Sequence, residues 1–472
     1  MKILLVRPGP PEETIGLKSL MVVEPLELEV LAASVSADNE VRIADLLLEK
    51  RSLAAIVRTF QPDVVGVTGY IVNVYSMMDC CRTAKEIKPS VVTVAGGVHV
   101  ELNPGDLDSE FVDYRVVFNA TRNFPALLAF IKGKGALPDG VLTRGIKEYN
   151  RHGVVPDFYY PLPRRELTAA FRKKYYYVFH NKVTLVKTSF GCPYSCNFCY
   201  CRELTGGKYA VRQLEEVVDE IAGIKGREIY VADDNFLVSK ERVLQFIRLV
   251  KERGIRKRYL IYGRSDFIAA HPDVMQAFKE IGLRTVIVGI ESFNDSELSV
   301  LNKQVNAAVN EEAVRVLNRY RIDCYAAVVT LDTYTDADFR FLGDKLNSLG
   351  IKYVNIQPVT PLKGTEYGAV TRDLLIAPDD FARWDLAHVV IKPVNMSVAD
   401  YYRNIIRLYR RILYKPRNIL SNFKYSPLFV WKIIRGSFRV WSQYRQKVKE
   451  AERLYGRKAG NHLQDSLHAD RA

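Results

Sequence analysis

The chain has 472 residues, a length that predicts two or three domains. Hydrophobic residues make up 48% and charged residues 26%, which excludes a wholly disordered, collagen-like or disulfide-scaffold protein. The net charge of +14 is concentrated at one end, because residues from Tyr401 onward carry 17 Lys and Arg against 4 Asp and Glu. We therefore expect a nearly neutral body and a basic C-terminal region with an anionic partner.

The beginning of the chain does not resemble a signal peptide. Met1–Val6 is too short for an apolar signal core and is predicted to form the first strand. No run approaches the roughly 18 consecutive apolar residues of a membrane-spanning helix. The seven cysteines are odd in number and have no secretory context, so a disulfide framework is not expected. These features predict a cytoplasmic protein.

Residues 1–133 alternate short apolar runs with helical periodicity, which predicts a doubly wound α/β domain. Continuous apolar strands fit a parallel sheet covered by helices on both faces, with ligands at the carboxyl ends of the strands. The predicted strands are Lys2–Arg7, Glu40–Asp45, Asp63–Tyr70, Val91–Ala95 and Tyr114–Phe118, and the predicted helices are Pro25–Ser36, Leu46–Phe60, Val74–Lys88 and Phe124–Ile131.

A proline-containing linker is predicted over 134–182, and a second βα series over 183–368. Six βα units predict an open, partial (β/α)6 barrel with its active site at the carboxyl ends of the strands. The predicted strands are Val183–Ser189, Glu228–Ala232, Tyr259–Arg264, Thr285–Ile290, Cys324–Thr330 and Tyr353–Pro358. Residues 369–472 are predicted to be a helical, basic C-terminal region that is disordered after about residue 460.

A cysteine motif follows the first barrel strand, where Cys192, Cys196 and Cys199 have the spacing C-x3-C-x2-C. Three thiolates in one short loop can bind three irons of a [4Fe–4S] cluster and leave the fourth iron free. Zinc is the main alternative, but zinc sites usually take ligands as two separated pairs. Cys201 would be a cramped fourth ligand, and we expect it to be structural or to lie near the substrate.

This motif, with Phe198 before its third cysteine, resembles that of the radical SAM superfamily, and the resemblance covers most of 183–368. It implies that the free iron binds S-adenosylmethionine, and that the reduced cluster cleaves it to a 5′-deoxyadenosyl radical. A reducing partner such as flavodoxin or ferredoxin is implied as well. The turn Pro361–Thr365 resembles the family's Pro-x-Pro-Gly-Thr turn, with Lys363 where glycine is usual.

Polar residues at other strand ends fit the cofactor pocket of that family. Asp233 and Asp234 follow the second strand, where the family binds the amino group of S-adenosylmethionine; a capped turn is the alternative. Arg264 follows the third strand and would pair with the methionine carboxylate or form a structural ion pair. Glu291, in a Gly-Ile-Glu-Ser element after the fourth strand, would bind the ribose or the amino group.

The α/β domain before the barrel resembles the cobalamin-binding subfamily of radical SAM enzymes. The segment Gly96-Gly97-Val98-His99 is similar to its Gly-Gly-x-His element, and Gly69, Tyr70, Gly96, Gly97 and His99 would face the corrin. No Asp-x-His-x-x-Gly motif occurs, which implies a cobalt without a lower His ligand, and His99 is expected to bond locally. Where the subfamily has a Gly-Glu-Gly-Glu turn this chain has Phe-Asn-Ala-Thr-Arg-Asn, so a degenerate domain without cofactor is the alternative.

The segment 401–458 is rich in Arg, Lys, Tyr and Trp, and Val430, Ile434, Phe438 and Trp441 recur in it at helical spacing. A basic helix with an aromatic and apolar face is typical of an element at a membrane surface. Packing against the open side of the barrel is one alternative. Nucleic-acid binding is disfavoured, because no recognition module accompanies the charge.

Together these features predict a cobalamin-dependent radical SAM C-methyltransferase that acts on an unactivated carbon of a hydrophobic or lipid-like substrate. Ring formation or rearrangement without methyl transfer is the first alternative, and a non-catalytic iron–sulfur or redox-sensing protein is the second. The strand-end Asp233, Arg264 and Glu291 argue against a sensor, because a sensor needs no S-adenosylmethionine pocket. The protein is expected to be cytoplasmic, with peripheral contact at the inner membrane surface.

Overall fold

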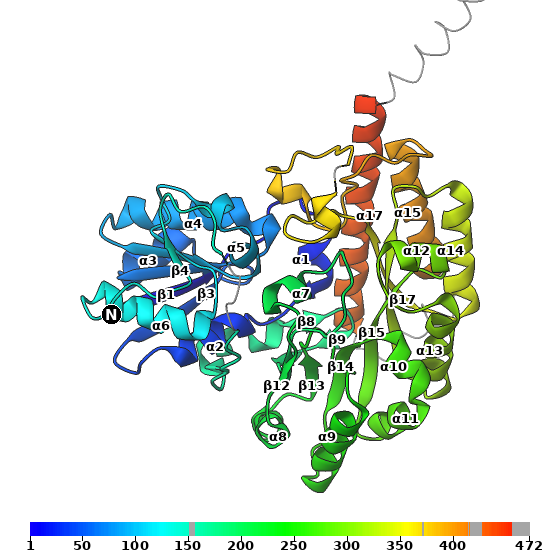
Figure 1. The fold of residues 1–472 in the computed structure, drawn as a ribbon, viewed down its shortest axis with the longest axis horizontal. Coiled ribbons are helices and arrows are strands. Elements are labelled where there is room, and N and C mark those ends of the chain that lie inside the picture. Colours follow the sequence, from blue (N-terminus) through cyan, green and yellow to red (C-terminus); the bar gives the residue numbers. More distant parts are fainter. Residues whose placement is uncertain (151–155, 371, 414, 416–426, 456–472) are drawn as a thin grey trace, which may run out of the picture.

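The computed structural model describes the chain except for residues 151–155, 371, 414, 416–426 and 456–472. An N-terminal α/β domain lies beside a larger barrel-like domain, and the long helix α17 (Pro427–Tyr455) runs where the two meet (Figure 1). The predicted α/β class and the two-part organisation are therefore confirmed. Our boundaries between domains stay predictions, and the expectation for residues after about 460 lies outside the described part of the chain.

The N-terminal sheet has the strand order β3-β1-β4-β5-β6-β7, and its first five strands in this order are parallel. Alternate residues of β1 are buried on opposite faces, with Leu4 in one apolar cluster and Leu5 in another, so helices cover both faces. The strands are β1 (Lys2–Arg7), β3 (Glu40–Asp45), β4 (Val64–Thr68), β5 (Val92–Gly96), β6 (Tyr114–Val116) and β7 (Val141–Thr143).

Two differences from the predicted N-terminal elements have local causes. Strand β7 pairs antiparallel with β6 inside the segment that we predicted to be a linker, and its three residues are too few for a periodic signal. The predicted helix Leu46–Phe60 begins only at Leu53, because the Ser52 side chain accepts the Ala55 N–H and caps it there. The main helices are α2 (Leu26–Ser34), α3 (Leu53–Phe60), α4 (Val74–Ile87) and α6 (Ala120–Ile131).

The second domain is the predicted open barrel of six parallel strands, in the order β10-β13-β14-β15-β16-β17. These strands are β10 (Thr184–Val186), β13 (Glu228–Val231), β14 (Arg258–Gly263), β15 (Leu283–Glu291), β16 (Asp323–Thr330) and β17 (Tyr353–Pro358). The covering helices include α8 (Leu214–Gly223), α9 (Lys240–Glu252), α11 (Pro272–Glu280), α13 (Ala307–Arg319) and α14 (Asp336–Ser348). Their apolar faces pack on the outside of the sheet in one large core.

A buried network of ion pairs joins the two domains. Arg165, in the 3-10 segment η3 (Arg165–Lys174), contacts Glu24 at 2.8 Å and Glu220 of α8 at 2.6 Å. Glu220 also accepts from Arg212 at 2.7 Å, and Glu24 accepts the backbone N–H of Leu185 in β10. The Glu24 side chain is fully buried, so its charge is compensated by these partners rather than by water.

The C-terminal helices α15 (Val398–Leu413) and α17 pack together, and α17 also packs on the short helix α1 (Leu17–Leu20). Gly436 makes that approach possible, because a Cβ there would lie 2.2 Å from the Ser19 carbonyl oxygen. The Gln443 amide donates to the carbonyl of Thr14 at 2.9 Å. The tail thus does pack on the body. Among the described helices, none combines the length and apolar character needed to cross a bilayer.

Candidate active site

The cysteine motif forms a loop at the carboxyl end of β10, before α7 (Tyr200–Thr205). The loop opens at Gly191, whose φ of +74° and close approach to the Lys208 carbonyl leave no room for a Cβ. The Asn302 amide donates to Ser195 O at 2.7 Å, and the Tyr367 N–H donates to Asn197 O at 2.8 Å. Contacts from distant parts of the barrel therefore shape the loop.

The three motif cysteines are partly exposed and influence one another electrostatically. Burial raises the pKa of the Cys192 and Cys196 thiols, whereas a hydrogen bond with Cys201 lowers that of Cys199. Among the described residues, no three His, Cys, Asp or Glu side chains converge closely enough for a single metal ion. In a [4Fe–4S] cluster each thiolate binds a different iron, so three cysteines spread along one loop fit that group.

Arg264, which follows β14, lies directly beside the cysteine loop. Its Nη1 atom is 3.8 Å from the Cys196 Sγ atom, and its guanidinium stacks on the Tyr194 ring at 3.6 Å. Its Nε atom donates to Asp266 at 3.2 Å, and its Nη2 atom donates to the Lys303 carbonyl at 2.9 Å. Arg264 thus forms an ion pair with Asp266, which is the structural alternative that we predicted for it. Its guanidinium also lies beside Cys196.

Glu291 ends β15 in a buried ion pair that the sequence did not reveal. Its Oε1 atom lies 2.9 Å from Lys303 Nζ, and both side chains are less than a tenth exposed. The φ of Glu291 is +57°, a left-handed conformation that costs about 1–3 kcal/mol in a residue other than glycine. A Cβ at Gly289 would lie 2.5 Å from the carboxylate and 2.7 Å from Nζ, so the pair needs that glycine.

The two aspartates after β13 occupy different positions. Asp233 is buried and accepts hydrogen bonds from the Thr188 N–H at 2.6 Å, the Thr188 hydroxyl at 2.5 Å and the Ser189 hydroxyl at 2.7 Å. Burial raises its pKa. Asp234 is more exposed and accepts from the Gly191 N–H at 2.9 Å. Asp233 therefore fixes the end of the first strand, whereas Asp234 faces the cysteine loop.

Three glycines at the carboxyl edge of the N-terminal sheet present no side chain. Gly97 has a φ of +99°, and a Cβ there would lie 2.4 Å from Thr68 Oγ1; a Cβ at Gly69 would lie 2.5 Å from Asn73 Cβ. At Gly96 the nearest atom would be 3.8 Å away, so packing alone would tolerate a methyl group. This partly exposed edge carries no side chain at Gly69, Gly96 and Gly97, which fits close approach of a flat macrocycle such as a corrin.

Tyr70 stands between the two domains. Its side chain is 64% exposed, yet desolvation together with Glu27, Tyr262 and Asp234 raises its pKa to about 12. Glu27 belongs to the N-terminal domain, whereas Tyr262 lies in barrel strand β14 and Asp234 follows β13. Ionisable groups from both domains therefore lie near the exposed ring of Tyr70.

His99 bonds locally, as predicted. It is almost fully buried, and its Nε2 atom lies 3.1 Å from Asp106, which is also 2.7 Å from Lys363 Nζ. Lys363, at the position where glycine is usual in the resembling turn, thus links the last barrel turn to the N-terminal domain. Asn103 strengthens this link by donating to the Lys363 carbonyl at 3.1 Å.

The inner wall of the barrel is aromatic. Tyr177 and Tyr230 lie with ring centroids 5.0 Å apart, and Tyr230 and Tyr262 lie 6.0 Å apart. Tyr325 contacts the same group, which packs with Leu26 of the N-terminal domain. The interior of the barrel therefore holds a cluster of aromatic rings with few formal charges.

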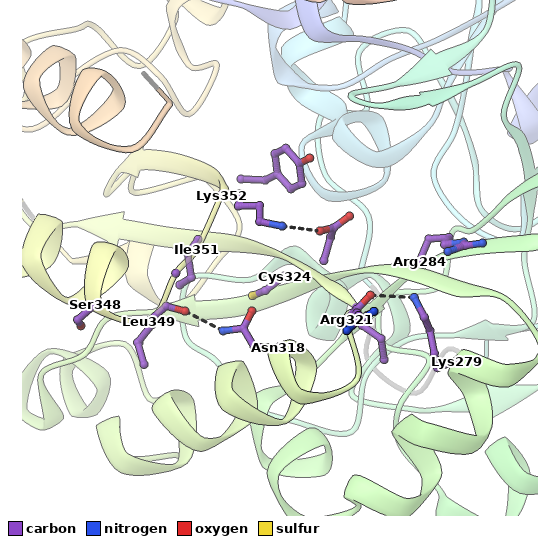
Figure 2. Close-up of a pocket in the computed structure, with 13 residues that line it drawn as sticks. Lys279, Arg284, Asn318, Arg321, Cys324, Ser348, Leu349, Ile351 and Lys352 are labelled. Carbon is purple, nitrogen blue, oxygen red and sulfur yellow. Dashed lines mark hydrogen bonds and ion pairs between the residues drawn. The ribbon is translucent and has the colours of Figure 1, made fainter. Parts of the chain in front are cut away.

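A cleft of about 570 Å³ lies at the opposite, amino end of β15, β16 and β17 (Figure 2). Both of its lysines have structural partners: Lys279 donates to the Arg321 carbonyl at 2.8 Å, and Lys352 lies 3.7 Å from Asp323. Basic residues at the ends of helices complement the negative end of the helix dipole. This cleft is separate from the cysteine loop, and we assign it no catalytic part.

Two family models match the chain, that of the radical SAM superfamily over residues 186–346 and that of the B12 binding domain over residues 13–128. The hopanoid C-3 methylase of Methylococcus capsulatus is 26% identical over 88% of this chain and 80% of its own length. The anaerobic magnesium-protoporphyrin IX monomethyl ester cyclase of Cereibacter sphaeroides is 23% identical over 77% of this chain and 62% of its own length.

The fold also matches a solved structure over nearly the whole chain. The radical S-adenosylmethionine methyltransferase TsrM from Kitasatospora setae, with cobalamin and a [4Fe–4S] cluster bound, superposes with a TM-score of 0.64 at 18% identity and covers 96% of this chain and 99% of its own. A radical SAM domain implies a [4Fe–4S] cluster and S-adenosylmethionine, and a B12 binding domain implies cobalamin. The cysteine loop and the bare glycine edge fit these groups.

Proposed function

We propose that this chain, which joins a B12-binding domain to a radical SAM domain, is a C-methyltransferase that acts on an unactivated carbon of a hydrophobic, lipid-like substrate. The observation that carries the proposal is the contact between the two domains near their strand ends, where Lys363 of the last barrel turn binds Asp106 and accepts a hydrogen bond from Asn103. When bound, the cluster with S-adenosylmethionine supplies a carbon-centred radical, and cobalamin supplies a methyl group. Both groups would thus lie where the two domains meet.

In this proposal each residue has a defined task. Cys192, Cys196 and Cys199 hold the cluster. Asp234, which is partly exposed beside the loop, is the better candidate for the ammonium of S-adenosylmethionine, while Asp233 positions the loop through Thr188 and Ser189. We assign Arg264 to the electrostatic environment of Cys196 and to the carboxylate of the methionine portion.

Glu291 and Lys303 complete the pocket on the other side. The carboxylate is already paired with Lys303, so we assign it one remaining oxygen for the ribose or amino group. On the N-terminal edge, Gly69, Gly96 and Gly97 would let the corrin approach the backbone, with Tyr70 beside it. His99 would stabilise that edge through its hydrogen bond with Asp106 rather than bind cobalt.

Two considerations favour a lipid-like substrate. Tyr230 and Tyr325 of the barrel strands form an aromatic cluster with Tyr177, and their rings offer apolar contact area. The relative with a hopanoid as its named substrate aligns with 88% of this chain. A cyclase or rearrangement enzyme is the second candidate, supported by the aligned cyclase, which matches a smaller part of the chain.

We further propose a reducing protein partner, such as flavodoxin or ferredoxin, and a cytoplasmic location with peripheral contact at the inner membrane surface through 401–458. The reducing partner is supported by chemistry, because each reductive cleavage needs a one-electron donor. The membrane contact is supported by the basic charge of this segment.

The test is an anaerobic reaction of the reconstituted protein with dithionite, S-adenosylmethionine, hydroxocobalamin and candidate isoprenoid lipids, followed by mass spectrometry. Formation of 5′-deoxyadenosine together with S-adenosylhomocysteine and a methylated lipid is the expected result. 5′-Deoxyadenosine without S-adenosylhomocysteine would refute methyl transfer and favour the cyclase. If neither product forms in cluster-loaded protein, the radical mechanism itself is wrong.

A matched pair of variants makes the assay specific. Cys199→Ala should bind less iron and form no 5′-deoxyadenosine, because one cluster ligand is lost. Cys201→Ala lies in the same loop and should retain the cluster. Full turnover by Cys199→Ala would refute the radical mechanism, because the cluster would then take no part in the chemistry.

A further inference from the structure

Helix α17 carries an outward face that the fold does not use. Trp431 is 64% exposed, Ile434 54% and Phe438 62%, and with Trp441 they recur at intervals of three and four residues along one side of the helix. The opposite side makes the packing contacts, through Phe429, Ile433 and Tyr444. Large apolar side chains gathered on the outside of a packed helix indicate a further contact surface.

Basic side chains flank this face. Arg435 and Arg439 are exposed next to the apolar side chains on α17. Where α17 meets α15, a shallow groove of about 640 Å³ is lined by Arg407, Arg410, Arg411 and Trp441. Arg411 pairs with Asp344, and Arg407 donates to Asn404, whereas Arg410 has no ion-pair partner among the described residues. Within the described part of the chain, the groove therefore offers a guanidinium without an ion-pair partner beside an indole.

An apolar face flanked by basic side chains favours one kind of partner. An apolar centre with a rim of cations matches the interface of a bilayer, where acyl chains lie below a layer of phosphates. A second copy of the chain, placed face to face, would bring Arg435 and Arg439 against their own counterparts. Nucleic acid would need the cations but would leave Trp431, Ile434 and Phe438 in water.

We propose that this face of α17, together with the arginine groove, docks the protein on an anionic phospholipid membrane. Trp431, Ile434 and Phe438 enter the interfacial layer, and the groove takes a lipid phosphate at Arg410. The inference rests on the proposed function in one respect, because it would bring the enzyme to a membrane in which a lipid-like substrate resides. It concerns binding alone and can be tested without turnover.

The experiment is flotation of the full-length, cofactor-loaded protein with vesicles of phosphatidylcholine and phosphatidylglycerol, and with vesicles of phosphatidylcholine alone. We expect binding to the anionic vesicles only. Trp431→Ser/Phe438→Ser should reduce it at least tenfold, and Arg410→Gln should reduce it roughly fivefold, as expected for one cation at an anionic surface. Phe341→Ser, which removes an exposed phenylalanine from α14, is the matched control and should bind normally.

Tryptophan fluorescence supplies a second readout. Trp384 is buried in the body, so quenching by brominated lipids reports on Trp431 and Trp441. We expect quenching that Trp431→Phe diminishes. Equal binding to neutral and anionic vesicles would overturn the proposal, as would a dimer that Trp431→Ser/Phe438→Ser dissociates, or equally tight binding of duplex DNA through the same residues. Methyl transfer to a detergent-dispersed substrate would persist in the surface variants, which separates a failure of docking from a failure of the proposed function.

Discussion

The buried pair of Glu291 and Lys303 allows a quantitative prediction. In the variant Lys303→Met, the Glu291 carboxylate would remain buried without its 2.9 Å partner. Burial lowers the pKa of Lys303, but Glu291 and Cys196 outweigh it and raise the pKa above its usual value, so the wild-type pair is ionic. The substitution therefore removes a charge and not only a hydrogen bond.

The expected cost follows from the geometry. Two unit charges 2.9 Å apart attract by about 6 kcal/mol at an effective dielectric constant of about 20. Since part of this offsets desolvation, removal of one partner of a buried pair typically costs about 3–5 kcal/mol. For a barrel domain of this size, that corresponds to a fall in Tm of roughly 10 °C. The double variant Glu291→Gln/Lys303→Met leaves no unpaired charge and should recover most of the loss.

The assay is anaerobic thermal unfolding of the four proteins of this cycle, followed by circular dichroism and scanned at two rates. The pair is correctly interpreted if the double variant is more stable than Lys303→Met. A fall of less than about 3 °C in Lys303→Met would refute the reasoning, as would losses that simply add in the double variant. Lys303→Arg keeps the charge and serves as the conservative control.

Further predictions concern other parts of the site. Gly97→Ala should weaken hydroxocobalamin binding, measured by difference absorbance, and cost about 2 kcal/mol of stability, whereas Gly96→Ala should leave stability unchanged, because only the first meets a close contact at positive φ. Asp233→Asn should destabilise the protein by about 2 kcal/mol in chemical unfolding, since it weakens three hydrogen bonds, whereas Asp234→Asn should retain stability and lose affinity for S-adenosylmethionine in calorimetry. Burial raises the pKa of Asp106, but bonds with His99 and Lys363 outweigh it and hold that pKa below the usual value. Its contribution to stability is therefore present above about pH 4 and lost as the pH falls through the lower folded value, a dependence that Asp106→Asn should remove from urea unfolding curves.

The pattern of apolar and polar residues predicted correctly those strands whose ends depend only on neighbouring residues in the chain. Lys2–Arg7 and Glu40–Asp45 agree with the structure to the residue, because each is a short apolar run between polar or proline-containing segments. Val183–Ser189 was too long, since β10 ends at Val186 and the next residues turn toward β12 (Ala210–Val211). That turn is fixed by Asp233, whose partners lie more than forty residues away in the chain, and no local rule encodes such a contact.

The candidate site shows the same division. The cysteine spacing was sufficient to identify the loop, because all three ligands lie within one short segment. Lys303 was missed because neither side chain three or four residues away pairs with it, and its partner Glu291 lies across a helix. In α17, apolar spacing predicted an outward stripe through Val430, Ile434 and Phe438, and Ile434 and Phe438 are exposed. The spacing did not reveal the buried side, where Phe429 and Ile433 pack on Tyr176, because that contact comes from a distant part of the chain.

The ion-pair network around Arg165 has a consequence for how such enzymes can be recombined. Glu24 and Glu220 reach the same guanidinium from different domains, so the seam between them is chemically specific rather than a generic apolar contact. A B12-binding domain transplanted from a relative would bring a foreign residue opposite Arg165 and leave a charge without its counterion. Exchange of substrate specificity between relatives should therefore succeed when η3 travels with the N-terminal domain and its acidic counterpart on α8 is matched, and should yield insoluble protein when the graft is made at the linker alone.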